Sequence, residues 1–145
     1  MYSKILLPTD GSDGAVKAIK TGLELAEQFG ATVHTLYVID TRFVAADTDF
    51  VVEKAEREAE QAVDYVNDLG TEYSVTVEKH LRRGVPHKEI LEAIEAHDID
   101  LIVMGTHGRT GIDRFVHLGS VTERVVRAAP VHVTTVPLRT RTSAE

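Results

Sequence analysis

Residues 99–111 read IDLIVMGTHGRTG, an apolar run that is followed at once by a loop with three glycines. A short, nearly continuous apolar run is typical of a strand that is buried on both faces, as the strands of parallel sheets are. In such a sheet the loop after the carboxyl end of a strand lies at the edge where ligands bind. The stretch therefore predicts a buried strand at residues 99–104 and a ligand-binding loop after it.

The segments on both sides of this stretch alternate between strand and helix patterns. Apolar runs and β-branched residues predict strands at residues 5–7, 32–39, 73–77, 99–104 and 131–136. Apolar residues that recur every three or four positions predict helices at residues 13–30, 52–69, 86–94 and 120–129. Five strands joined by four helical connections predict a doubly wound α/β fold, in which helices cover both faces of a five-stranded parallel sheet.

Several residues mark where these helices begin. Ser12 or Asp13 is expected to cap the first helix, and Pro86 suits the first turn of the third. Ser120 and Glu123 form a capping box, which predicts that Ser120 precedes the last helix.

Two strand orders are compatible with this pattern, and they place different loops together. In the order 3-2-1-4-5, residues 8–12 (PTDGS) lie beside the loop that starts at Gly105. In the order 2-1-3-4-5, residues 8–12 lie beside residues 82–84, which are expected to form the loop after the third strand. The glycine-rich sequence favours the first order.

Composition limits the function classes. The 145 residues suit one domain, expected at residues 1–137, with a flexible tail at residues 138–145. A net charge of −7 disfavours nucleic acid as a partner, and the absence of cysteine excludes disulfides and thiolate metal sites. The amino-terminal apolar run is too short for a signal or membrane segment, so we expect a cytoplasmic protein without a membrane partner.

The charge is distributed unevenly along the chain. Residues 47–72 hold nine acids and two bases, which we interpret as the solvated face of a helix rather than as a binding patch. Residues 105–130 hold four arginines and two acids, so an anionic ligand is expected to prefer that segment.

Two glycine-containing segments suit a phosphate: the loop with Gly105, Gly108 and Gly111, and Gly119-Ser120 at the start of the last helix. Backbone N–H groups approach an anion closely where no side chain intervenes, and a helix amino terminus adds partial positive charge. Neither GxxxxGK[ST] nor GxGxxG occurs, so the two common phosphate fingerprints are not met.

Four segments together resemble the universal stress protein family: KILLPTDGS at residues 4–12, GTHGRTG at residues 105–111, GSVTERVVRAAP at residues 119–130, and the turn Gly84-Val85-Pro86. The resemblance spans residues 2–136. It implies the order 3-2-1-4-5, dimers formed through the last strand, and in one branch an ATP site with the pattern G-x2-G-x9-G-[ST]. Proteins of this family act in the stress response and in signalling, without settled catalysis.

The resemblance also implies which residues hold ATP, ADP or AMP. The phosphate loop is matched by residues Gly105, Gly108, Gly119 and Ser120, with Met104, Thr106, His107, Arg109, Val121 and Thr122 within or beside it. The loop after the first strand is matched by Pro8, Thr9 and Asp10, whose carboxylate would meet the ribose or a phosphate-bound Mg²⁺, and the adenine wall is matched by Val38. Ten residues separate Gly108 from Gly119, where the family pattern has nine.

Each of these residues also has a purely structural interpretation. Gly105 and Gly108 suit tight turns, Ser120 suits a helix cap, and Asp10 suits a cap or a bond to a turn amide. Arg109 suits a solvated charge. His107 suits a hydrogen bond to the backbone or to a phosphate better than the role of general base, since no partner acid is evident.

The seven histidines show neither an HExxH pair nor a compact ligand cluster along the chain. We therefore expect no zinc site built by the protein itself.

Three functions follow from these observations. The first is a stress-response protein that binds an adenine nucleotide and acts as a regulatory or signalling dimer, paired through residues 131–136, with an unknown protein partner. The second is a dimeric interaction module that keeps the fold without nucleotide affinity, which the ten-residue spacer favours. The third is a slow ATP hydrolase, although we expect no enzyme. A monomer with a covered edge strand is the alternative to the dimer.

Overall fold

Parallel strands and helices alternate in the computed structural model, which describes residues 1–42, 49–107 and 118–137. The elements are β1 (Lys4–Pro8), α1 (Asp13–Phe29), β2 (Thr32–Asp40), α2 (Asp49–Glu72), β3 (Val77–Gly84), α3 (Pro86–Ala96), β4 (Leu101–Gly105), α4 (Ser120–Ala128) and β5 (His132–Val136). The strands form one sheet in the order β3-β2-β1-β4-β5, and all four neighbouring pairs are parallel. The predicted doubly wound α/β fold is confirmed, with the first of the two strand orders.

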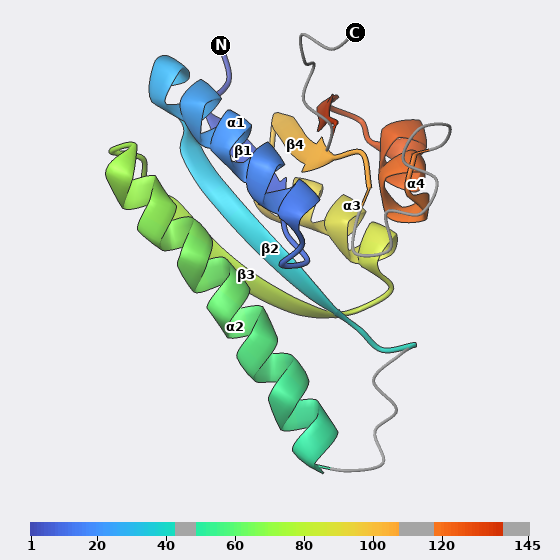
Figure 1. The fold of residues 1–145 in the computed structure, drawn as a ribbon. Helices are drawn as coiled ribbons and strands as arrows, with labels where there is room; N and C mark the ends of the chain where they lie inside the picture. The colour runs from blue at the N-terminus through green and yellow to red at the C-terminus, as the bar shows by residue number, and fades with distance from the viewer. Residues whose placement is uncertain (43–48, 108–117, 138–145) are drawn as a thin grey trace, which may run out of the picture.

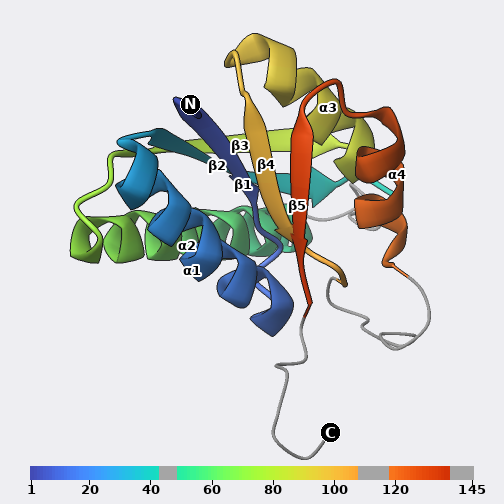
Figure 2. The same cartoon turned by 90° about the horizontal axis from the view of Figure 1, so that it is seen from above.

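The helices form a layer on each side of this sheet. Helices α1 and α2 cover one face, and α3 and α4 cover the other (Figures 1 and 2). Strand β1 lies in the middle, so side chains on both of its faces are buried. Ile5 and Leu7 pack into the core beneath α1, whereas Leu6 packs into the core beneath α3 and α4. The apolar run in β1 therefore reflects burial on both faces.

Three predicted helix ends are confirmed. The Ser12 hydroxyl caps α1 by accepting a 3.3 Å hydrogen bond from the Ala15 amide. Gly30 ends α1 in the left-handed conformation, at a φ of 65°, and Pro86 occupies the first turn of α3.

The predicted capping box of α4 is wrong. Gly119 is the cap and Ser120 already lies in the helix. The cause is the Gly119 peptide, whose N–H donates to the Thr106 carbonyl at 2.7 Å and whose carbonyl accepts from the Glu123 amide at 2.9 Å. These bonds start the helix one residue earlier.

The predicted boundaries of the third strand are also wrong. Tyr73 and Val75 follow α2 in a turn where Ser74 has a φ of 58°, and the strand starts only at Val77. The Gly70 carbonyl accepts hydrogen bonds from the amides of Tyr73, at 3.1 Å, and Val75, at 2.9 Å, which bind this segment to the end of α2. Residues 82–84, expected in the loop, belong to β3 and pair with β2.

The acidic residues of α2 lie on its outer faces, while Ala59, Val63, Val66 and Gly70 are buried. Two of the acids pair with the neighbouring edge strand, through Lys79–Asp64 at 2.9 Å and Arg83–Glu56 at 2.7 Å. A helix with the length and apolar content that a bilayer requires is not found among the described residues.

Replacing Leu6 by alanine is expected to destabilise the protein by about 3 kcal/mol, because Leu6 is fully buried in the central strand and its loss leaves a cavity. Urea unfolding monitored by circular dichroism measures the change. The matched control is Leu81→Ala on the edge strand β3, where the side chain is 42% exposed and a much smaller loss is expected. Equal losses at both positions would contradict the central role of β1.

Candidate functional site

A cavity of about 670 Å³ lies at the carboxyl ends of the strands, within the range of small-molecule sites. It is bordered by the loop after β1, the end of β2 and the first turn of α4. The sheet order places β1 beside β4, so two loops that are about 95 residues apart converge there, as parallel α/β sheets require at the point where strand order reverses.

Most of the predicted site residues line this cavity: Pro8, Thr9, Asp10, Val38, Met104, Gly105, His107, Gly119, Ser120, Val121 and Thr122. Thr106 is described but does not line it. Gly108 and Arg109 lie outside the described residues.

The loop after β1 is held by its own side chains. The Thr9 hydroxyl accepts a 3.1 Å hydrogen bond from the Gly11 amide, and the Asp10 carboxylate accepts a 2.9 Å bond from the Ser12 amide. Gly11 has a φ of 79°, a conformation that glycine adopts without strain. The interpretation that Asp10 binds a turn amide is confirmed, and this bond fixes the carboxylate at the border of the cavity.

Three hydrogen bonds join α4 and β5 to the end of β4. The Thr122 hydroxyl donates to the Gly105 carbonyl at 2.8 Å, and the Gly119 amide donates to the Thr106 carbonyl at 2.7 Å. The Thr106 amide in turn donates to the Val136 carbonyl at 3.1 Å. The first turn of α4 is thereby held against the cavity, where the N–H groups and the dipole of a helix amino terminus favour an anion.

Gly105 is explained by packing against α1. A Cβ atom at this position would lie 3.0 Å from the Gly14 carbonyl oxygen and 3.2 Å from its carbon. These contacts support the structural interpretation of Gly105, because any larger residue would push the amino terminus of α1 away from β4.

The cavity has an apolar wall and polar residues at its border. Val38, Ile90 and Met104 belong to the core beneath α3 and α4 and are continuous with the apolar wall. Asp40 and Arg42 lie at the end of β2 and form a two-pronged ion pair, with Nε–Oδ1 at 3.0 Å and Nη2–Oδ2 at 2.8 Å. The Arg42 guanidinium lowers the pKa of the Asp40 carboxyl below its ordinary value.

Sequence reasoning missed Asp40 and Arg42 as well as Ser12, Tyr37 and Glu58 in the lining. The signal for the first two was present, because residues 40–42 follow a predicted strand at its carboxyl end, the edge where ligands bind.

Three cations lie near His87, which follows Pro86 at the border of the cavity. Burial, and then the charges of Arg124, Lys88 and Arg42, lower the pKa of the His87 imidazole. Arg42 is paired with Asp40, and acids also belong to the lining of the cavity, so the border carries charges of both signs.

His107 is buried and holds a hydrogen bond across 2.9 Å between its Nδ1 and the Thr106 hydroxyl. The partner is a side-chain hydroxyl, whereas the sequence predicts a backbone group or a phosphate; the phosphate contact stays a prediction.

The spacing of the histidines along the chain shows no compact cluster, but the fold forms one. His34, His80 and His97 come together in the described residues, with one nitrogen of each within 4.8 Å of the others. Their separations along the chain gave no signal, because β2 and β3 pair in register and α3 returns over them.

Almost the whole chain is similar to known proteins of one family. The model of the universal stress protein family matches residues 1–137. Universal stress protein MJ0531 of Methanocaldococcus jannaschii is 39% identical over 134 residues, which cover 89% of this chain and 78% of that protein. The solved structure of MJ0577, a universal stress protein of the same organism, shares 32% identity and a TM-score of 0.83 over 98% of this chain and 99% of that chain.

A more distant structure shows the same fold. The universal stress protein of Archaeoglobus fulgidus in complex with dAMP is 22% identical, with a TM-score of 0.73 over 92% of this chain and 97% of that chain.

Replacing Thr122 by valine is expected to cost about 1 kcal/mol, because the isosteric side chain removes the hydroxyl bond that holds α4 to the Gly105 carbonyl. Thermal and urea unfolding measure the loss. Thr122→Ser keeps the hydroxyl and is expected to lose less stability than Thr122→Val. If the serine variant were less stable than the valine variant, packing and not the hydrogen bond would hold α4.

Proposed function

The chain belongs to the universal stress protein family, and we propose that it binds ATP or a related adenine nucleotide, ADP or AMP, in the cavity between the ends of β1 and β4. The observation that carries this proposal is the convergence of the β1 loop and the first turn of α4 on one cavity of about 670 Å³. We further propose that the protein acts in the stress response as a regulatory or signalling dimer.

The first turn of α4 supports the placement of the phosphates. Gly119 offers a peptide without a side chain, and Ser120 offers an exposed hydroxyl at the amino end of a nine-residue helix. A phosphate at this position gains backbone donors and the helix dipole together. Gly108 and Arg109 lie outside the described residues, and only the resemblance assigns them to the phosphate loop.

The apolar wall supports the placement of the adenine. Val38 is half-buried against the core beneath α3, close to the end of β2. A base that packs there leaves the ribose and phosphates to extend toward the β1 loop and α4. The Asp10 carboxylate then meets the ribose or a Mg²⁺ ion carried by the phosphates, for which oxygen ligands are the usual partners.

The dAMP complex of the distant A. fulgidus relative agrees with this ligand class, although that likeness establishes the fold alone. The ten residues between Gly108 and Gly119 are the specific observation for the second candidate, a dimeric interaction module without nucleotide affinity.

We propose no enzymatic activity. Hydrolysis of ATP needs a group that positions the attacking water, and among the described residues His107, the one histidine in the lining, is hydrogen-bonded to Thr106. Phosphate release by the purified protein above that of a Gly119→Val variant would instead favour the slow ATP hydrolase.

The remaining proposals concern the surroundings of this site. We propose one nucleotide-binding domain at residues 1–137, followed by a tail, a location in the cytoplasm, and an unidentified regulatory protein as partner. Dimer formation would occur through the edge strand at residues 131–136.

The two sheet edges differ in a way that supports this pairing. Edge strand β3 carries charged side chains, including Lys79 and Arg83, which oppose pairing with another strand. Edge strand β5 has the sequence HVTTV without a Lys, Arg, Asp or Glu, so its outer backbone groups favour pairing with a second copy.

Mass spectrometry of the purified, denatured protein is expected to show ATP, ADP or AMP. Titration calorimetry with Mg²⁺ measures the affinities. Gly119→Val is expected to lower the affinity for ATP by at least about tenfold and to leave the affinity for adenosine unchanged, because only the phosphates meet the added side chain. Val38→Asp is expected to lower the affinity for both ligands. Val51→Asp, at an exposed position on α2, is the matched control. Protein that is empty and also ignores added ATP would favour the interaction module.

Light scattering after size-exclusion chromatography is expected to give twice the 16.0 kDa chain mass. Thr134→Lys places a charge on the exposed face of β5 and is expected to shift the population toward the monomer. Thr71→Lys, at an exposed position on α2, should leave the mass unchanged. A monomer at all concentrations for the unmodified chain would contradict the dimer.

A further inference from the structure

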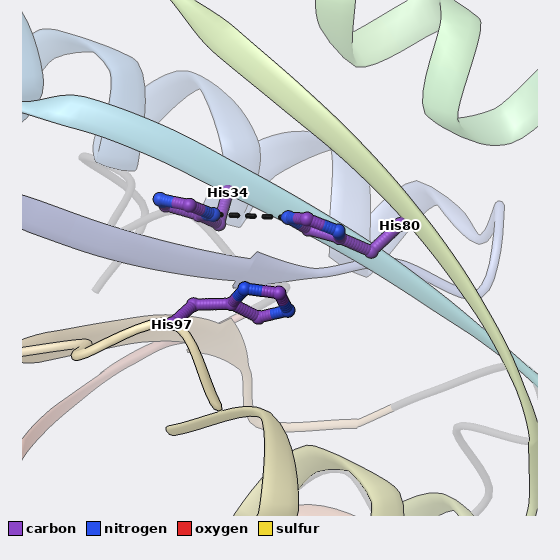
Figure 3. Close-up of side chains that lie close together, drawn as sticks. All are labelled: His34, His80 and His97. Atoms are coloured by element: carbon purple, nitrogen blue, oxygen red, sulfur yellow. Dashed lines mark hydrogen bonds between the residues drawn. The ribbon is translucent and has the colours of Figure 1, made fainter. Parts of the chain in front are cut away.

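Three histidines from separate elements gather on the α3 side of the sheet, away from the cavity. His34 comes from β2, His80 from β3, and His97 is the residue that ends α3 (Figure 3). His34 Nδ1 and His80 Nε2 are 2.9 Å apart and share a hydrogen bond, and their ring planes are nearly parallel, with an interplanar angle of 5°. The His97 ring stacks on His80 with a centroid distance of 4.0 Å.

We propose that His34, His80 and His97 form a binding site for a divalent transition metal ion of the zinc type. One nitrogen from each ring lies within 4.8 Å of the others. Three imidazole nitrogens suit Zn²⁺, which bonds to histidine at about 2.0–2.1 Å in tetrahedral sites, and they are a poor match for Mg²⁺ or Ca²⁺, which prefer oxygen ligands.

A carboxylate lies where a metal-binding histidine commonly has its second partner. The Glu78 carboxylate is 3.9 Å from Nε2 of His34, on the opposite side of the ring from the Nδ1 atom that faces His80. A proton on Nε2 that faces Glu78 leaves Nδ1 with a lone pair directed toward the cluster. At 3.9 Å the two groups form an ion-pair contact and not a hydrogen bond, so the carboxylate must move closer to act as the partner that fixes the tautomer of a ligating ring.

The surroundings also favour the neutral imidazoles that a metal requires. His34 is buried, and burial is the main cause that lowers its pKa; burial and the charge of His97 lower the pKa of His80. The other charged groups that act on these two rings are Lys4 on β1 and Glu78 and Arg82 on β3.

Binding needs small movements that the partly exposed rings allow. Tetrahedral geometry places ligand nitrogens roughly 3.3 Å apart, so the present separations must change by on the order of 1 Å. The proton between His34 and His80 moves, by exchange with solvent, to the other nitrogen of the ring that carries it, so that both rings stay neutral and both facing nitrogens have a lone pair. His97 turns so that a nitrogen in its ring plane faces the ion. His80 and His97 are half-buried, which leaves a path from solvent and a fourth position for water.

The cluster is separate from the proposed nucleotide site. His34 lies near the start of β2, whereas the cavity is at the carboxyl end of the same strand. A metal bound here would join β2, β3 and the end of α3, three elements that are otherwise held mainly by strand pairing and core packing.

The test uses the full chain after removal of metal with EDTA, without nucleotide, at pH 7.5, where imidazoles are mostly neutral. Zn²⁺ is titrated in competition with a chromophoric chelator, and Co²⁺ is added separately, since its visible absorption reports tetrahedral coordination. We expect one Zn²⁺ per chain with a dissociation constant in the micromolar range or below, together with an increase in the melting temperature.

Variants identify the ligands. Groups that hydrogen-bond to a metal ligand contribute roughly 10–100-fold to metal affinity. His80→Gln and His97→Gln are expected to lower the affinity for Zn²⁺ by more than this, and Glu78→Gln is expected to lower it about tenfold. His132 lies on β5, away from the cluster, and is hydrogen-bonded to Tyr2. The His132→Gln variant should bind Zn²⁺ as the unmodified chain does. Circular dichroism and the melting temperature without metal confirm that each variant is folded.

Three results would overturn the proposal. The first is no Zn²⁺ binding by the folded chain, which would make the cluster a hydrogen-bonded packing motif. The second is unchanged affinity in both His80→Gln and His97→Gln. The third is an equal loss in His132→Gln, which would indicate binding elsewhere. Nucleotide binding plays no part in this measurement, so its failure leaves the proposed function unaffected.

Discussion

The position of β1 in the middle of the sheet is the constraint from which the candidate site follows. From β1 the chain moves outward to β2 and β3, and it then crosses back to build β4 and β5 on the other side. Right-handed connections place α1 and α2 on one face for the first direction and α3 and α4 on the other face for the second. The connections after β1 and β4 therefore leave the sheet toward opposite faces, and the cavity lies between the loops that start them.

The two sides of that cavity have different chemistry because different forces hold them. The Val38 side is an extension of the apolar core, so its shape is fixed by packing beneath α3. The α4 side is fixed by polar bonds to backbone carbonyls, from the Thr122 hydroxyl and the Gly119 amide. An amphipathic ligand with a flat apolar end and an anionic end matches this arrangement, and the proposed adenine nucleotide has both.

Sequence reasoning succeeded where the deciding interaction is local or where burial leaves a periodic trace. Ser12, Gly30 and Pro86 mark helix ends through their own backbone chemistry, and the run in β1 reports burial on both faces. Sequence reasoning failed where a residue that is distant in the sequence determines the local structure. Ser120 has the pattern of a cap, but the carbonyl of Thr106 holds Gly119 in that role. The three histidines were separated along the chain, and only the register of β2 with β3 brings two of them together.

Helix α3 links the two ends of the molecule that carry chemistry. Its first residue, Pro86, lines the cavity and the residue that ends it, His97, belongs to the histidine cluster, about 16 Å apart at 1.5 Å per residue. Ile90 and Ile94 hold the helix against the sheet between these points. Coupling between two sites requires an element with two arrangements of similar energy. A helix that is packed along its whole length has a single arrangement. A metal at the cluster would therefore stabilise the folded chain by mass action, without changing the affinity of the cavity for its ligand.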